Sequence, residues 1–289
     1  MSIVLQLLVS GISMGFIYAL VALEYTLIWN ATGLLNFSHD KFIMLSAYVF
    51  AGTYVAALDL PYGYAVLFAL ITMFLFGIVV ALMIFNPLSA MSSNLYAIIG
   101  TVILGRIITE SIRLLWGPIP FTLDTFLKGT ISVGDQVVSR PYIYIVVICT
   151  IITFALTIFL KKSKAGMAMR CVSNNKNAAA LMGINVPMNM ALTVGISASI
   201  CTAIGILIVP LFNVHATMST MIGLKGFCAG VVGGFGYLPG AILGGLLMGL
   251  VENFGSMILP SVYKDVVSFG LLILFLLFRP SGLLGHKRT

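Results

Sequence analysis

Charged residues are scarce in this chain, and their scarcity decides the broad class of protein. Only 8% of the 289 residues are charged, against about 25% in an ordinary soluble domain. So few charges cannot cover the core of a soluble protein of this length. Intrinsic disorder is excluded as well, because 60% of the residues are hydrophobic. The composition therefore predicts an integral membrane protein that crosses the lipid bilayer several times.

Motifs for catalysis and for metal binding are also missing from the sequence. The four cysteines form no CxxC pair and the three histidines are widely separated, so we expect no disulfide, no metal site and no cofactor. No HExxH motif occurs, and no GxxxxGK[ST] loop is present to hold nucleotide phosphates. We therefore expect that the chain is not an enzyme and does not hydrolyse ATP by itself.

The net charge of +7 is better explained by basic cytoplasmic loops than by nucleic acid as a partner. Between Lys161 and Lys176 the chain has five basic residues and no acid. The positive-inside rule places this loop, about residues 161–189, in the cytoplasm. The loop 117–140 balances two acids (Asp124, Asp135) against two bases (Lys128, Arg140) and is predicted outside. The C-terminal tail is predicted inside because it carries Arg279, Lys287 and Arg288.

Nine apolar segments are present, and a chain of this length can hold about eight to ten spans. Helix is the expected form, because backbone polar groups in lipid must be bonded within the segment. We predict an all-α polytopic membrane protein, with residues 1–289 as a single domain of eight to nine spans that includes broken, glycine-rich helices. Nine spans place the N-terminus outside and the C-terminus inside. The segments are Ile3–Trp29, Phe42–Leu58, Tyr64–Phe85, Tyr96–Trp116, Tyr142–Leu160, Met190–Pro210, Thr217–Gly236, Gly240–Leu259 and Val262–Phe278.

Glycine is concentrated late in the chain, with eight glycines from Gly230 to Gly249. Small residues let helices approach closely in lipid, so tight packing is one interpretation. The other is that an unwound backbone near Pro239 lines a pathway, since irregular backbone at membrane depth is tolerated where it lines a cavity. The candidate pathway glycines are Gly233, Gly234, Gly236 and Gly240.

Two further polar features lie between or within the apolar segments. Asn36, Ser38, His39 and Asp40 form the densest polar cluster, which either forms a structural turn or contributes to a pathway. Ionisable groups inside spans are costly and face other helices or water. Glu24 is one of them. Arg106, Glu110 and Arg113 form a stripe whose spacing allows ion pairs within one helix. Lys225 and Glu252 can pair between neighbouring helices.

The basic loop contains a short segment that is predicted to be helical. Alanines follow Asn177, Gly183 is placed to end the helix, and Pro187 prevents its continuation. Such a helix either lies on the lipid surface or enters a groove of a cytoplasmic partner. Asn177, Ala178, Ala179 and Gly183 follow the EAA-xxx-G pattern of ABC importer permeases, with asparagine at the glutamate position.

Longer segments extend this resemblance over nearly the whole chain. Gly33–Tyr48, which contains NFSHDK, resembles the NFAHGE-type segment of the branched-chain amino-acid ABC permease family of LivH type. Gly223–Gly255 resembles the glycine-rich segment of that family, and Tyr263–Gly285 resembles its C-terminal ending. This chain has Asp40 and Lys41 where the family motif has its glycine and glutamate.

The resemblance implies a bacterial inner-membrane subunit of an ABC importer. Its partners would be ATP-binding cassette subunits, a second homologous permease and a periplasmic solute-binding protein. The solute would be a branched-chain or other small hydrophobic amino acid, and the loop of about residues 161–189 would couple to the ATPases. Relatives that move urea or short amides leave a second choice of solute open. An ion-coupled secondary transporter using Glu24, Glu110 and Glu252, and an intramembrane enzyme, are the remaining alternatives.

Overall fold

The computed structural model describes residues 2–89, 91, 94–123, 126–127, 129–133, 136–258, 260, 263–279 and 281–285. Seven residues named from the sequence lie outside these ranges, so the structure adds nothing about them. They are Asp124, Lys128, Asp135, Leu259, Val262, Lys287 and Arg288.

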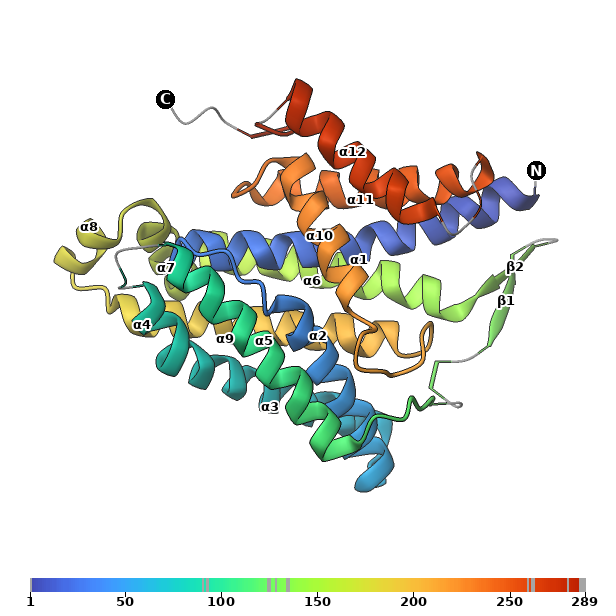
Figure 1. The fold of residues 1–289 in the computed structure, drawn as a ribbon, viewed down its shortest axis with the longest axis horizontal. Coiled ribbons are helices and arrows are strands. Elements are labelled where there is room, and N and C mark those ends of the chain that lie inside the picture. Colours follow the sequence, from blue (N-terminus) through green and yellow to red (C-terminus); the bar gives the residue numbers. More distant parts are fainter. Residues whose placement is uncertain are drawn as a thin grey trace. The chain divides into compact units, whose positions relative to one another are not determined.

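Helices make up most of the described chain (Figure 1). Two stretches of π-helix, η1 (Val49–Ala57) and η2 (Ala81–Phe85), continue α2 and α3. The α-helices are α1 (Ser2–Thr32), α2 (His39–Tyr48), α3 (Tyr62–Val80), α4 (Asn86–Ser89), α5 (Asn94–Trp116), α6 (Arg140–Lys162), α7 (Lys164–Asn174), α8 (Lys176–Leu181), α9 (Val186–Ile208), α10 (Thr220–Gly233), α11 (Leu238–Ile258) and α12 (Lys264–Phe278).

Each of the nine predicted segments overlaps a helix, but the predicted number of spans is not confirmed. Within the described residues, six helices are long and apolar enough to cross a membrane. The second segment corresponds to α2 and η1, which have 10 and 9 residues. The seventh and ninth segments correspond to α10 and α12, which have 14 and 15 residues, and a span needs about 20. The multi-spanning, mainly helical class is confirmed, and the chain is an integral membrane protein.

A β-hairpin is the exception to the all-α prediction. Strands β1 (Thr130–Val133) and β2 (Gln136–Ser139) pair antiparallel, with Thr130 opposite Ser139 and Val133 opposite Gln136. The hairpin lies in the loop that charge balance places outside. Each strand has only four residues, which is too short to show a clear alternation of apolar and polar residues. The sequence therefore did not reveal the hairpin.

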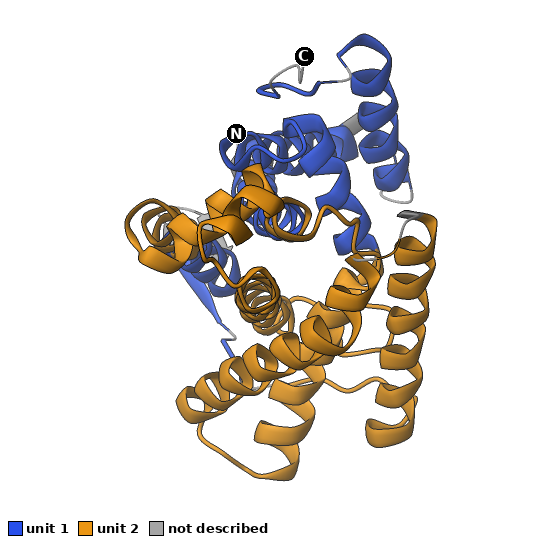
Figure 2. Cartoon of the chain, turned by 90° about the vertical axis from the view of Figure 1, so that its left-hand side faces the viewer, with its two compact units in different colours: residues 1–26, 124–151, 221–289 blue, residues 27–123, 152–220 orange. Residues whose placement is uncertain are grey.

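The helices gather into two compact units (Figure 2). Unit 1 comprises residues 1–26, 124–151 and 221–289, and unit 2 comprises residues 27–123 and 152–220. In unit 2, α9 packs against α2 and α3, and α2 also packs against α5. Helix α9 is the most deeply buried of the six candidate spans, so it forms the centre of this unit.

Close helix contact through glycine organises unit 1. A Cβ atom placed on Gly249 of α11 would meet the backbone nitrogen and Cα of Gly15 in α1, and one on Gly245 would meet the backbone of Ala19. Gly245 and Gly249 are the GxxxG pair, so this part of the glycine-rich sequence serves packing. Small residues here bring two helix backbones together without the side chains that would hold them apart.

A buried ion cluster joins three further helices of unit 1 to α1. Lys225 Nζ in α10 lies 2.9 Å from Glu252 Oε1 in α11 and 2.7 Å from Asp265 Oδ1 in α12. Tyr18 of α1 donates a hydrogen bond of 2.9 Å to the other oxygen of Glu252. The side chains of Lys225 and Glu252 are only 7% and 8% exposed. The pairing that the sequence left open is therefore a cluster of one cation and two carboxylates.

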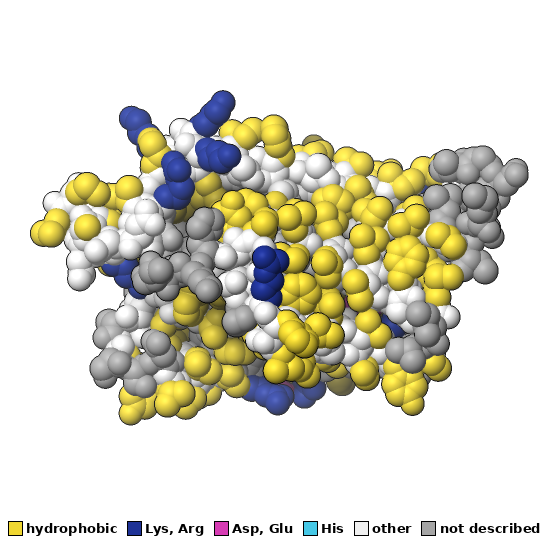
Figure 3. Space-filling model, turned by 90° about the horizontal axis from the view of Figure 1, so that it is seen from above, with side chains coloured by type: hydrophobic (Ala, Val, Ile, Leu, Met, Phe, Trp, Pro, Cys, Tyr) yellow, Lys and Arg dark blue, Asp and Glu magenta, His cyan; other side chains and the backbone are white. Residues whose placement is uncertain are grey.

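Hydrophobic side chains cover most of the described surface on the face drawn in Figure 3, with Lys and Arg in a few groups. The exposed side chains along α3 include Leu67, Ile71 and Leu75. Those along α6 include Val147, Ile151 and Phe154. Such helix faces suit contact with lipid, since nothing in them needs water.

We predict that Gly249→Val destabilises the chain, because the added side chain must push α11 away from the backbone of α1. Overpacking of this kind costs about 1–3 kcal/mol, and here the contact is with rigid backbone. The melting temperature in detergent and the abundance in the membrane should both fall. Gly270→Ala is the matched control, since Gly270 of α12 has open space around its Cβ position. Equal melting temperatures for the two variants would contradict the packing role of Gly249.

A second prediction concerns the ion cluster. Lys225→Met leaves two neighbouring carboxylates without their cation, and breaking a buried ion pair on one side costs about 3–5 kcal/mol. The double variant Lys225→Met, Glu252→Gln should regain part of this loss, because only Asp265 stays charged and its side chain is 42% exposed. Thermal unfolding of the purified variants measures both effects. A double variant that is no more stable than the single one would argue against the cluster.

Candidate functional site

The polar residues just before α2 form a hydrogen-bonded turn. Asn36 Oδ1 accepts hydrogen bonds from the backbone nitrogen of Ser38 at 3.0 Å and from its hydroxyl at 2.6 Å. Thr101 Oγ1 accepts from the backbone nitrogen of Phe37 at 3.2 Å. Asn36, Ser38 and His39 are all buried. These bonds supply partners for the backbone where the chain turns into α2, so the structure supports the structural-turn interpretation of this segment.

Lys41 also has a local partner. Its Nζ lies 2.6 Å from Asp40 Oδ2 and donates to Thr220 Oγ1 at 3.0 Å. The side chains of Lys41 and Asp40 are 17% and 13% exposed. Lys41 and Asp40, the two positions that depart from the family motif, therefore form an ion pair with each other and leave no net charge at the start of α2.

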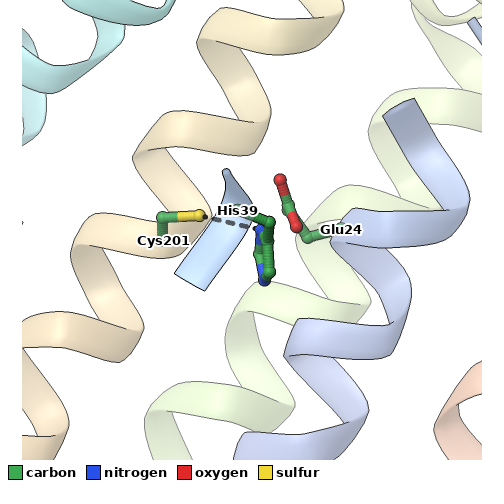
Figure 4. Close-up of side chains that lie close together, drawn as sticks. All are labelled: Glu24, His39 and Cys201. Atoms are coloured by element: carbon green, nitrogen blue, oxygen red, sulfur yellow. Dashed lines mark hydrogen bonds between the residues drawn. The ribbon is translucent and has the colours of Figure 1, made fainter. Parts of the chain in front are cut away.

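His39 and Cys201 meet inside unit 2. His39 Nδ1 lies 3.6 Å from Cys201 Sγ, and both side chains are fully buried (Figure 4). Nearby, the hydroxyl of Ser46 donates to the backbone oxygen of Cys201 at 3.2 Å. We read this contact as part of the packing of α2 against α9.

The candidate pathway glycines lie at the turn between α10 and α11. Gly234 and Gly236 have φ of +110° and +92°, a conformation that glycine adopts without strain. A Cβ on Gly233 would meet the carbonyl of Gly240, and one on Gly234 would lie 2.6 Å from the backbone nitrogen of Gly285. These contacts favour packing, which was the first of the two interpretations open from the sequence.

The C-terminal segment is bound to the end of α10. The backbone nitrogens of Leu283 and Leu284 donate to the carbonyls of Val232 and Gly233 at 2.8 and 3.1 Å. Two of the three segments that carried the resemblance are therefore in contact, through residues about fifty positions apart in the sequence. The glycines keep both backbones close enough for these hydrogen bonds to form.

The predicted loop helix is present as α8, and Gly183 ends it as expected. Gly183 has φ of +83°. Its backbone nitrogen donates to the carbonyl of Ala180 at 3.0 Å, and that of Ile184 donates to the carbonyl of Ala179 at 3.1 Å. This pair of bonds is the Schellman motif. At the other end, Asn175 caps the helix by accepting from the backbone nitrogen of Ala178 at 3.0 Å.

Helix α8 is held against the end of α1. Lys176 Nζ donates to the carbonyl oxygen of Thr32 at 2.5 Å, and Thr32 is the last residue of α1. Cations are favoured at helix C-termini, where carbonyl oxygens lack helical partners. Burial lowers the pKa of Lys176. The basic residue therefore helps to fix the position of the loop helix.

The exposed tip of this loop is apolar, and it differs from the residues chosen from sequence. Ala179 is 1% exposed and packs within the chain, whereas Asn177 and Ala178 are exposed. Leu181 and Met182 are 90% and 68% exposed. Sequence reasoning missed these two residues, although large apolar side chains next to a helix-ending glycine were the available signal. Two adjacent, strongly exposed apolar side chains make this tip a candidate contact surface.

Comparison with known proteins places the chain in a family. The family model described as the permease component of branched-chain amino acid transport systems matches residues 7–276. The high-affinity branched-chain amino acid transport permease BraD of Pseudomonas aeruginosa is 34% identical, over 99% of this chain and 97% of that protein. LivH of Escherichia coli K12 is 32% identical over 99% and 96%.

A more distant relative matches over a somewhat smaller part of the chain. A probable branched-chain amino acid transport permease of Methanocaldococcus jannaschii is 26% identical over 92% of this chain and 88% of that protein. The chain belongs to the family of permease components of branched-chain amino acid transport systems.

Proposed function

We propose that this chain is the membrane permease subunit of an ABC importer for branched-chain or other small hydrophobic amino acids. The observation that carries the proposal is the similarity to BraD and LivH over nearly the whole length of each protein. A permease of this kind works with ATPase subunits and a solute-binding protein. We further propose a second, homologous permease as its membrane partner and a bacterial inner membrane as its location.

The orientation is proposed from loop charge. The loop that carries α7 and α8 includes Lys161, Lys162, Lys164, Arg170 and Lys176, and short basic loops remain in the cytoplasm. This places α8 on the side where ATP is available. With nine spans, the N-terminus would then lie outside and the C-terminus inside.

Energy coupling is proposed to occur through the tip of α8. The chain has no phosphate-binding loop, so work must reach it through contact with an ATP-binding subunit. Leu181 and Met182 offer an apolar contact, and the Schellman motif at Gly183 holds them on a rigid helix end. Asn177 and Ala178 lie on the exposed part of the same helix, whereas Ala179 supports it from inside.

Urea or short amides are the second candidate solutes. In this family the binding protein delivers the solute to the permease. The choice is therefore a matter for a transport assay with competing solutes.

We predict ATP-dependent uptake of labelled leucine when this chain is expressed with its ATPase, permease and binding-protein partners in a strain that lacks leucine import. Isoleucine and valine should compete, whereas urea and acetamide should not. Collapse of the ion gradients should leave uptake intact in vesicles loaded with ATP. Uptake that needs an ion gradient and no ATP would instead favour a secondary transporter.

Variants at the tip of α8 test the coupling proposal. Gly183→Val forces a β-branched residue into positive φ, which costs about 1–2 kcal/mol, and Leu181→Asp places a charge on the exposed apolar tip. Both should remain in the membrane, lose co-purification of the ATPase subunits and reduce leucine uptake. Met167→Asp is the control, because Met167 is an exposed apolar residue of α7 in the same loop. If Leu181→Asp retains both the ATPases and transport, α8 is a surface helix without a coupling role.

A further inference from the structure

Helix α5 differs from the other candidate spans in its exposed charges. Its exposed face carries Arg106, Glu110 and Arg113. Among the described residues of the remaining spans, charged side chains away from the helix ends are buried, as Glu24 and Glu252 are. The exposed faces of α3 and α6 are apolar by contrast. Lipid contact therefore explains α3 and α6 but does not explain α5.

Arg106 is too deep in its helix to reach the membrane surface. It is the thirteenth of the 23 residues of α5, so about 15 Å of helix separates it from the nearer end at 1.5 Å per residue. Snorkelling moves a charged head toward the interface by only part of that distance. An arginine at the centre of a span faces a water-filled cavity or a partner, because exposure to lipid is costly.

The opposite face of α5 is already used inside unit 2. Leu104, Ile108 and Ile112 are buried, and α5 packs against α2. The helix therefore cannot rotate to bury Arg106 without exposing these residues. The charged face is open for a contact that the isolated chain does not make.

The other two charges of the stripe neutralise each other. Arg113 Nη1 lies 3.1 Å from Glu110 Oε1. In the part of the chain that the structure describes, no hydrogen bond or ion pair reaches the guanidinium of Arg106. Apart from Glu110, which is paired with Arg113, the neighbours of Arg106 on this face are apolar and exposed, with Val102, Ile103 and Ile107 at 46%, 53% and 58%. One unneutralised cation thus stands among aliphatic side chains.

From this arrangement we propose that the exposed face of α5 lines the solute pathway and that Arg106 binds the carboxylate of the amino acid in transit. A guanidinium binds a carboxylate through two parallel hydrogen bonds. The exposed aliphatic side chains beside it would contact an apolar solute side chain. This inference rests on the proposed function and deepens it, because it names a residue that recognises the solute within the membrane.

Substitution of Arg106 tests the carboxylate contact. In the complete complex with its ATPases, second permease and binding protein, Arg106→Gln should lower leucine uptake by about tenfold or more. Arg106→Lys should retain part of the uptake, since the charge remains but the paired geometry is lost. Co-purification of the second permease and ATP hydrolysis stimulated by the binding protein should stay near wild type.

Charge rescue separates a pathway residue from a packing residue. In a chain whose four cysteines are replaced by alanine, Arg106→Cys should react with water-soluble methanethiosulfonates and be protected by leucine. Modification with the aminoethyl reagent, which restores a positive charge, should raise uptake, whereas the sulfonatoethyl reagent should not. Ile151→Cys on α6 is the matched control, because Ile151 is also exposed at mid-helix and should not react.

Three outcomes would overturn the inference. Full uptake by Arg106→Gln would show that the guanidinium does not contact the solute. Loss of the second permease from Arg106→Gln complexes would show that Arg106 pairs with an acid of that subunit instead. Equal labelling of the cysteines at 106 and 151 would show that α5 does not line an aqueous path. Failure of the wild-type complex to transport leucine would instead contradict the proposed function. The wild-type assay therefore tests the proposed function, and the three variant results test the role of Arg106.

Discussion

The ammonium group of Lys225 is the interaction on which the arrangement of unit 1 depends. It lies between the carboxylates of Glu252 and Asp265, and Tyr18 bonds the remaining oxygen of Glu252. Four helices, α1, α10, α11 and α12, contribute one group each. A buried charge requires partners at fixed positions, whereas apolar contacts between helices in lipid tolerate sliding and rotation. The cluster therefore sets the register of helices that the glycine contacts bring close together.

The helices could be predicted from the sequence because a backbone in lipid must form its hydrogen bonds within the segment. Long apolar runs correspond to α1, α3, α5, α6, α9 and α11, and the loop helix with its terminal glycine was predicted from alanine content and the position of Gly183. The number of spans could not be settled this way, since α10 and α12 are short. The hairpin β1–β2 was missed because four-residue strands produce no clear pattern.

The roles of the site residues were harder to predict, because they depend on whether each side chain faces the interior or the surface. The sequence showed that Asn36, Ser38 and His39 are polar, but only the fold shows that they are buried in a turn. It showed that Ala179 belongs to a helix, but not that this residue faces inward while Leu181 faces outward. The stripe on α5 was visible as spacing, and its internal pair Glu110–Arg113 was expected. The exposure of Arg106 was not, since exposure depends on which face packs against α2.

The distribution of cysteines has a practical meaning for chemistry on the native chain. Cys149, Cys201 and Cys228 are buried, and Cys171 on α7 is partly exposed. A polar thiol reagent applied to the unmodified protein therefore has one accessible target, which lies in the loop that also carries α8. Cys171 thus offers a single attachment site for a fluorophore or spin probe. Movement of this loop during the transport cycle can be followed without engineering the protein.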